Sequence, residues 1–563
     1  MKKNYKLQNT NYKGGGTPGL LRVPNHNFQN YKQKINEKFL PGSWGRFFKK
    51  SPLAKKELKM SIQEIKGILL EIKKLGSIEA VLQWDQETYM PEGSGDIRAE
   101  HIAYLSSLAH SKHTGERFRL LLEKIVDMKT GEALDQKVDP ETRRLYYLIW
   151  KDYRDAAALP PDFVEELSRH SAKSQQVWAK ARRENDYEAF APYLEKMVQL
   201  KKQEAEYYGY ETTPYDSLID KYEPGMTSGR ITALFDELRG PLIRLVQNIK
   251  NSGTVINEKP LERSFDVDKQ WEFGIEVAKA MGYDFKYGRQ DKSAHPFTTS
   301  FHPTDVRITT RLKEDYFKTG IFATIHETGH ALYEQGLPAA DYGTPFGEPV
   351  SMGIHESQSR LWENYVARSK QFWEHFYPIL KKYFKKPLRG ISMERFYRMI
   401  NTVTPSLIRV EADEVTYSLH IMLRFEIEKM LINGNLSVKE LPGVWDQMME
   451  DYLGIRPGDY KDGVMQDVHW STGGFGYFPT YVLGNLYAAP IMNRARQEIP
   501  QLEEQIKTGV LLPLREWLLE KIHSKGQRLF AGELIRDLTG SSLSAKPFLD
   551  YLEKKYGEIY EIN

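Results

Sequence analysis

The 563-residue chain contains no cysteine. Disulfide scaffolds, thiolate metal sites, iron–sulfur clusters and cysteine nucleophiles are therefore excluded. Any transition metal must be held by His, Asp or Glu side chains. No apolar run approaches the roughly 18–20 residues of a membrane-spanning helix, which excludes an integral membrane function. With 40% hydrophobic and 28% charged residues, the composition is that of a soluble globular protein with a large core.

Acidic residues are scarce at the N-terminus. Residues 1–59 contain 14 Lys and Arg but only two acids, a net charge of +12, whereas residues 60–563 carry a net charge of −9. The basic segment has no sustained apolar period, which predicts a disordered extension; an arm that binds nucleic acid or a membrane surface, and a transit-like peptide, are the alternatives. It also lacks the apolar core of a secretory signal, and we expect a cytoplasmic protein.

Helical periodicity dominates residues 60–563, with short interruptions that contain Pro and Gly. We predict one large, mostly α domain. Its first helix is expected at 60–75, where Ser61 and Glu64 form a capping-box pattern. The helices that matter most for function are expected at 319–335, 356–384 and 405–434.

One stretch, residues 295–312, has a different pattern. It is rich in Thr and Phe, and the apolar Val306 and Ile308 alternate with polar residues, which is typical of a strand. We therefore expect two short strands joined near Pro303. They would form a small β-sheet directly before the helix at 319–335.

That helix contains an H-E-x-x-H motif, formed by His326, Glu327 and His330. At 3.6 residues per turn, the two histidines lie one turn apart on the same face, so both imidazoles can reach one ion. Glu327 lies about 100° around the helix, where it can accept a proton from water beside the ion. The alternative is a chance match on a surface helix, expected in roughly 2–3% of chains of this size.

A catalytic zinc site takes three protein ligands and leaves one position for water. Glu356 follows His330 by 26 residues and opens the next predicted helix, which makes it the candidate third ligand. His355 and Glu363 are rivals, although Glu363 is better placed to hold a ligand histidine from behind. Two histidines and a glutamate beside a glutamate base favour metal-assisted amide hydrolysis.

Several further motifs stand in a fixed order along the chain. They are Trp84-Asp85 with Met90-Pro91, His295-Pro296-Phe297, the stretch Asp305 to Thr309, the H-E-x-x-H motif, His355-Glu356-Ser357, the stretch Ile408 to Asp413 and the stretch Gly463 to Trp470. In these motifs the chain resembles the carboxypeptidase Taq family of metallocarboxypeptidases over essentially all of residues 60–563. The family implies nothing for residues 1–59.

The resemblance implies a largely helical zincin domain with a deep substrate groove, a zinc or cobalt ion, and a homodimer. It also implies release of single C-terminal residues with broad specificity and poor cleavage at terminal Pro. The ligands that it implies are His326, His330 and Glu356. The general base that it implies is Glu327.

An exopeptidase must recognise a terminal carboxylate, which the planar fork of Arg suits best. Arg409 and Arg307 are the candidates. Arg409 lies in a predicted helix whose acidic neighbours, such as Asp413, either orient it or form a purely structural salt bridge with it; Arg307 has the same structural alternative. His295 either lines the groove or only bonds within its turn, and Gln466 is a further candidate substrate contact.

The oxyanion of the tetrahedral intermediate also needs hydrogen-bond donors. His469 precedes a glycine-rich, loop-like turn and is one candidate. The alternative is a buried His469 paired with Asp467. Tyr417 is the second candidate, because it would share a helix face with Arg409, and its alternative is an ordinary structural tyrosine.

Two other functions remain compatible with the sequence. A groove-type metallo-oligopeptidase would cut internally and differs only in lacking the terminal-carboxylate clamp. A non-catalytic helical protein with a structural metal site would have no use for Glu327 as a base. We predict a metallocarboxypeptidase that acts on peptides with one divalent ion, zinc before cobalt. Neither a membrane nor nucleic acid is an expected partner of residues 60–563.

Overall fold

The computed structural model describes residues 52–562, so the predictions for residues 1–51 lie outside the described residues. Residues 60–563 form one compact unit. This unit is mostly helical and contains one small sheet, as predicted. In the described part of the chain, no helix is both long and apolar enough to cross a membrane.

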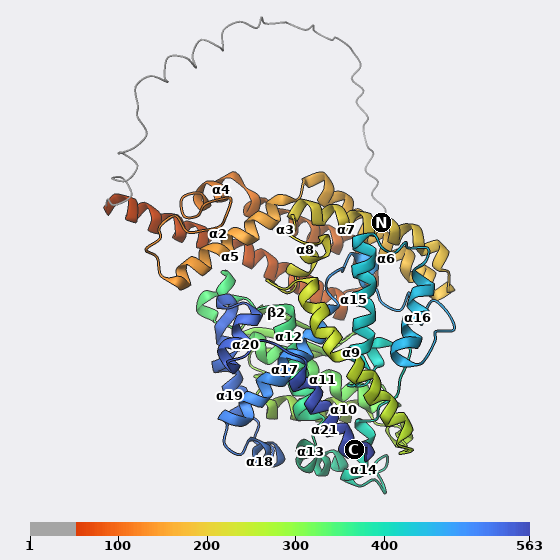
Figure 1. Ribbon diagram of the computed structural model, residues 1–563. Helices are drawn as coiled ribbons and strands as arrows, with labels where there is room; N and C mark the ends of the chain where they lie inside the picture. Colours follow the sequence, from red (N-terminus) through yellow and green to blue (C-terminus); the bar gives the residue numbers. More distant parts are fainter. Residues whose placement is uncertain (1–51, 563) are drawn as a thin grey trace, which may run out of the picture. The chain divides into compact units, whose positions relative to one another are not determined.

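The first helices of this unit form a layer along one of its ends (Figure 1). Their bounds are Pro52–Thr88 (α2), Gly95–Thr114 (α3), Glu116–Leu122 (α4), Pro140–Ala158 (α5), Pro161–Glu184 (α6) and Tyr187–Tyr208 (α7). Two of these helices begin with an aspartate N-cap. Asp139 accepts a hydrogen bond from the Thr142 amide at the start of α5, and Asp186 accepts one from the Ala189 amide at the start of α7.

The first helix begins earlier than the sequence pattern predicted. α2 starts at Pro52, a residue suited to the first helical position, and good helix formers follow it. Ser61 therefore lies inside the helix, and the predicted capping box does not exist. Glu64 instead pairs with Arg117 of α4, with its Oε1 2.7 Å from Nε.

The two predicted strands are confirmed as β2 (Thr298–His302) and β3 (Asp305–Thr310), which pair antiparallel. A third strand, β1 (Gly288–Lys292), pairs parallel with β3 on its other side, so the sheet order is β1-β3-β2. β1 escaped prediction because its sequence is polar and has no β-branched residue.

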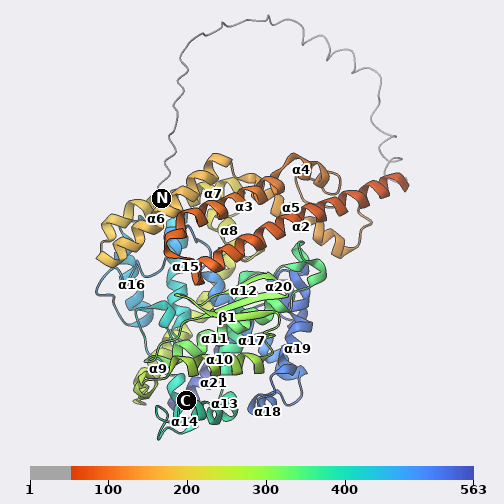
Figure 2. The same ribbon diagram turned by 180° about the vertical axis from the view of Figure 1, so that it is seen from behind.

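The sheet lies between the N-terminal layer and a group of central helices (Figure 2). A continuous apolar core, from Ala181 to Tyr560, joins α6 and α7 of the N-terminal layer and the strand β3 to the central helices. The remaining helices are α8 (Pro214–Asp220), α9 (Ser228–Asn251), α10 (Val267–Met281), α11 (Phe317–Gln335), α12 (Met352–Arg360), α13 (Lys370–Tyr383), α14 (Met393–Ile400), α15 (Tyr417–Asn433), α16 (Leu441–Leu453), α17 (Pro479–Glu498), α18 (Leu502–Lys507), α19 (Leu512–Lys521), α20 (Ala531–Thr539) and α21 (Lys546–Tyr560).

The helix predicted at 319–335 is confirmed as α11, but two other predicted helices are interrupted. The stretch 356–384 consists of α12, the π-helical segment η5 (Leu361–Ala367) and α13. The first half of 405–434 is not α-helical. Asp413 accepts from the amides of Val415 and Thr416, and such local bonds delay the start of α15 to Tyr417.

Two glycines allow α12 to approach its neighbours closely. A Cβ at Gly329 of α11 would lie 2.7 Å from the Cα of Ser359, and a Cβ at Gly484 of α17 would lie 2.5 Å from the Cγ of Glu356. Real Cβ atoms do not tolerate such contacts, so any larger residue would separate the helices. Glycine at these positions places α12 between α11 and α17.

We predict that Gly484→Ala destabilises the protein by about 1–3 kcal/mol, because the added methyl group overpacks the contact with Glu356. Gly76→Ala in α2 is the matched control, since its Cβ would meet nothing within 4 Å. The control should be neutral or stabilising by up to about 1 kcal/mol through helix propensity. Denaturant unfolding of both variants measures the difference, and equal stability would contradict the packing argument.

Candidate metal centre

α11 and α12 bring together His326, His330 and Glu356, whose ligand atoms all lie within 4.8 Å of one another. The Glu356 Oε2 atom is 3.6 Å from the Nε2 of His326 and 3.3 Å from the Nε2 of His330. These two distances are compatible with bonds of about 2.0–2.2 Å from each atom to a shared ion, which need separations below about 4.4 Å. Within residues 52–562, this is the one cluster of three His, Asp or Glu side chains with such geometry.

The Nδ1 atom of His326, on the side of the ring away from Glu356, is bound by a carboxylate. This atom donates to the Glu363 Oε2 at 2.9 Å, and Arg368 donates to the other carboxylate oxygen at 3.0 Å. Burial raises the pKa of Glu363, but Arg360, His326 and Arg368 together lower it well below its usual range. An ionised Glu363 therefore orients His326 with Nε2 facing the candidate ion, the role expected from its spacing.

His330 has a different support. Its Nδ1 lies 2.6 Å from the Nδ1 of His355 and 3.1 Å from the His355 carbonyl oxygen, while the Nε2 of His355 is 2.8 Å from a Glu334 oxygen. His355 thus lies behind His330, on the side away from Glu356. Burial lowers the pKa of His330 to about 3, so the ring is neutral at neutral pH and has a free lone pair for a metal.

Glu356 is fixed by the cation one helical turn after it. Arg360 donates from Nε to Oε1 at 2.7 Å, and Ser359 donates to Oε2 at 3.2 Å. Burial raises the pKa of Glu356, but Arg360 and the two imidazoles outweigh this and hold it well below the usual range. The carboxylate is therefore charged, as a metal ligand must be.

Glu327, the candidate base, is 7% exposed. Thr298 of β2 donates its hydroxyl to the Glu327 Oε2 at 2.6 Å and also approaches the carbonyl oxygen of Glu327 at 2.9 Å. The sheet therefore orients the carboxylate on α11. Burial raises the pKa of Glu327, which makes it a better proton acceptor near neutral pH than an exposed glutamate.

Arg409 lies in a short 3-10 turn, η6 (Arg409–Glu411), and not on a helix face with Tyr417. The two nevertheless meet, because Arg409 donates from Nη1 to the Tyr417 hydroxyl at 3.2 Å. The acid that orients Arg409 is Asp467, which accepts from Nε at 3.0 Å and from Nη2 at 2.8 Å. The expectation that Asp413 does this is wrong, since Asp413 bonds to backbone amides at the start of α15.

Gln466 joins two loops near Arg409. Its Oε1 accepts from the Arg409 amide at 2.9 Å, and its Nε2 donates to the Leu407 carbonyl at 2.9 Å. Both ends of the side chain are therefore engaged by the backbone. Its predicted contact with substrate stays a prediction.

His469 begins a 3-10 turn, η7 (His469–Thr472), as the loop-like context suggested. Asp467 binds Arg409 and Arg424 instead of His469. The Nε2 of His469 lies 3.4 Å from the Tyr481 hydroxyl, and the Tyr481 ring packs against Tyr417. Burial lowers the pKa of His469 to about 4, so it is neutral at neutral pH and can donate one N–H.

The other two predicted substrate contacts lie elsewhere. Arg307 pairs with Asp305 at 2.9 Å and is stacked between the rings of Trp84 and Phe301, at 4.4 and 4.8 Å from their centroids. His295 is exposed in the loop before β2. Among the described residues, no hydrogen bond or ion pair connects either side chain to the three candidate ligands.

Sequence reasoning missed three contributors to the site. Arg360 binds Glu356 and its guanidinium lies 4.3 Å from the centre of the Tyr417 ring. The i,i+4 spacing of Glu356 and Arg360 was an available signal for this pair. Thr298 and Tyr481 had no such signal, because their contacts join distant segments.

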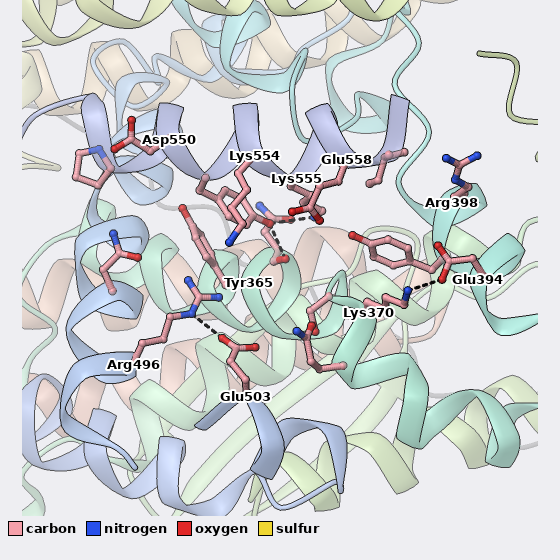
Figure 3. Close-up of a pocket in the computed structure, with 18 residues that line it drawn as sticks. Tyr365, Lys370, Glu394, Arg398, Arg496, Glu503, Asp550, Lys554, Lys555 and Glu558 are labelled. Atoms are coloured by element: carbon pink, nitrogen blue, oxygen red, sulfur yellow. Dashed lines mark hydrogen bonds and ion pairs between the residues drawn. The ribbon is translucent and has the colours of Figure 1, made fainter. Parts of the chain in front are cut away.

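A cavity of about 780 Å³ lies beside η5, between α14, α17 and α21 (Figure 3). Ion pairs line it, including Lys370 with Glu394 and Arg496 with Glu503, each at 2.7 Å. None of the candidate site residues lines this cavity, so the metal centre lies outside it.

The family described as carboxypeptidase Taq (M32) metallopeptidase matches residues 64–556. The chain belongs to the carboxypeptidase Taq family. Thermostable carboxypeptidase 1 of Thermus thermophilus is 44% identical over 497 residues, which cover 86% of this chain and 96% of the relative. Carboxypeptidase 1 of Bacillus subtilis is 38% identical, covering 88% and 98%. The crystal structure of an M32 carboxypeptidase from Deinococcus radiodurans has a TM-score of 0.85 and 39% identity, covering 89% and 100%.

These relatives confirm the resemblance and the fold class predicted from the motifs. As a member of the carboxypeptidase Taq family, the chain is a metallocarboxypeptidase, a peptide hydrolase that uses a divalent metal. The His-His-Glu cluster offers a site for that metal within the described residues.

We predict that Glu363→Gln weakens metal affinity by about 10–100-fold, because a neutral amide holds the His326 Nδ1–H less strongly than a carboxylate does. Chelator competition measures the dissociation constant. Glu374→Gln on α13 is the control, since Glu374 makes only a 3.6 Å surface pair with Lys507. Unchanged affinity in Glu363→Gln would show that His326 does not depend on this contact.

Proposed function

We propose that this protein removes single C-terminal residues from peptides, with His326, His330 and Glu356 as the ligands of one divalent ion. The observation that carries the proposal is the convergence of two imidazole Nε2 atoms on one charged carboxylate oxygen, next to the buried Glu327. Zinc is the expected ion because the donor set is nitrogen and oxygen, with cobalt as the alternative.

When bound, the ion supplies Lewis acidity to the scissile carbonyl and to water. Glu327 accepts the proton of the attacking water and passes it to the leaving amine. Thr298 keeps the Glu327 carboxylate oriented during both steps. Tyr417 and His469 are the proposed donors to the developing oxyanion, and both are connected through Tyr481.

Recognition of the terminal carboxylate is assigned to Arg409, with Arg307 as the second candidate. Arg409 is 6% exposed and connects through Tyr417 and Arg360 to the ligand Glu356, so it belongs to the same charged cluster as the ligands. Arg307 belongs to a separate cluster with Trp84. Broad side-chain specificity, poor cleavage at terminal Pro, a homodimer and a cytoplasmic location complete the proposal on the basis of the family resemblance.

For the base, we predict that Glu327→Gln lowers turnover by roughly 10²–10⁴-fold while the metal remains bound, because the amide cannot accept the proton of water. Steady-state kinetics and the metal content of the purified variant are measured together. Near-normal turnover with full metal content would eliminate Glu327 as the base.

For the binding of the terminal carboxylate, Arg409→Ala should lower kcat/KM for peptides with a free C-terminal carboxylate. The expected loss of transition-state stabilisation is about 2–5 kcal/mol, because the buried carboxylate of the substrate loses its partner. C-terminally amidated peptides should already be poor substrates and should lose little more. The coupling between the two changes is read from a double-mutant cycle, with Arg307→Ala measured in parallel. Equal losses on both peptides would make Arg409 structural, and efficient internal cleavage of amidated peptides would favour an oligopeptidase.

A further inference from the structure

The first turn of α12, the helix that carries Glu356, is anchored by a distant part of the chain. The Met352 amide donates to the Tyr222 carbonyl at 3.0 Å, and the Gly353 amide donates to the Glu223 Oε2 at 2.9 Å. The first amides of a helix have no partner within it. Residues 222 and 223, just after α8, supply two of those partners.

Glu223 also ties α12 to α17. Its Oε1 accepts from the hydroxyl of Ser351, the N-cap residue of α12, at 3.0 Å and from the Tyr487 hydroxyl of α17 at 2.8 Å. The carboxyl group is fully buried, and burial raises its pKa to about 7. The three hydrogen-bond donors and the positive end of the helix dipole act against this effect of burial, because they stabilise the charged form of Glu223.

These contacts lie one turn from the candidate metal ligand. Gly353 precedes Glu356 by three residues, and Tyr487 follows Gly484 by three residues on α17. Gly484 is the residue against which Glu356 packs. The same face of α17 therefore contacts Glu223 through Tyr487 and the candidate ligand Glu356 through Gly484.

The packing between Glu223, Gly353 and Tyr487 is tight. A Cβ at Gly353 would lie 2.5 Å from the Glu223 Oε2 and 2.9 Å from the Tyr487 ring. A displacement of α12 along its axis by about one residue step, 1.5 Å, would break these contacts. It would move Glu356 by the same distance, which is most of the length of a metal–ligand bond of about 2.0–2.2 Å.

We propose that Glu223 is a positioning residue for the metal centre: it fixes α12 along its axis against α17, and so fixes the Glu356 carboxylate relative to His326 and His330. Glu223 itself forms no hydrogen bond or ion pair with His326, His330 or Glu356. The inference rests on the proposed function, because it requires Glu356 to be a ligand.

Glu428 provides a matched control. It is also a fully buried carboxyl group whose pKa burial raises to about 7. It also accepts from a tyrosine hydroxyl and a backbone amide, those of Tyr215 at 2.6 Å and Gly476 at 2.9 Å. Its third donor is the Trp470 indole, and none of these contacts involves α12.

The test measures zinc affinity of the full chain by chelator competition, together with the unfolding midpoint of the metal-free protein. We expect Glu223→Leu and Gly353→Ala to weaken zinc binding by about 10–100-fold. Glu223→Gln should retain most of the affinity, because its amide oxygen can still accept from Gly353. Glu428→Leu should destabilise the protein but bind zinc as the wild type does.

Zinc affinity of Glu223→Leu equal to the wild type would overturn the inference. Equal weakening in Glu428→Leu would also overturn it, because the effect would then reflect general destabilisation. If Glu223→Leu does not fold, the zinc affinity of Gly353→Ala is compared with that of Glu223→Gln. Equal affinities in these two variants would reject the proposal. A wild-type chain that binds no zinc would instead refute the proposed metal site itself.

Discussion

The candidate metal centre depends on main-chain proximity between α12 and its two neighbours. On one side, Gly329 lets α11 touch the backbone of Ser359; on the other, Gly484 lets α17 touch Glu356. Because glycine has no side chain, the helices approach to backbone contact, which larger residues would prevent. The relative positions of the ligands are therefore set by rigid helices and only secondarily by flexible side chains. This arrangement is what a site needs when it must hold donors at fixed distances from an ion.

The second requirement is that the charges of the buried acidic side chains are balanced by neighbouring cations. Glu356 and Glu363 are both buried, and an unpaired carboxylate there would be costly. Arg360 lies between them, bonding Glu356 at 2.7 Å and Glu363 at 3.3 Å, and Arg368 pairs with Glu363 at 3.0 Å. Two cations thus balance the charges of a candidate ligand and of the residue that supports another. The Arg360 guanidinium packs on Tyr417, which is bonded to Arg409. The candidate substrate-binding arginine is thus connected to the candidate ligand Glu356 through Tyr417 and Arg360.

The sequence predicted the parts of this site that depend on local spacing. The H-E-x-x-H spacing and the start of the next helix indicated His326, His330 and Glu356 as candidate ligands, and the structure places the three together. Alternation predicted β2 and β3. Features set by distant contacts were missed or misplaced. Asp467, 58 residues after Arg409, is its partner in place of Asp413, and Asp413 itself begins α15 by bonding to nearby amides. β1 pairs parallel with β3, a contact that its polar sequence does not signal. Ser61 lies inside a helix that begins before the predicted capping box.

Glu363 comes from the π-helical segment η5, where each turn holds about one residue more than in an α-helix. This geometry constrains how the length of the chain can vary during evolution. Arg368 lies five residues after Glu363; its amide donates to the Glu363 carbonyl at 3.0 Å, and its side chain pairs with the Glu363 carboxylate at 3.0 Å. Loss of one residue between them would break this i,i+5 match, and with it the support of the carboxylate that holds His326. Insertions and deletions among related chains should therefore collect after α13, around the exposed Lys385 and Lys386, and should be absent from the seven residues of η5.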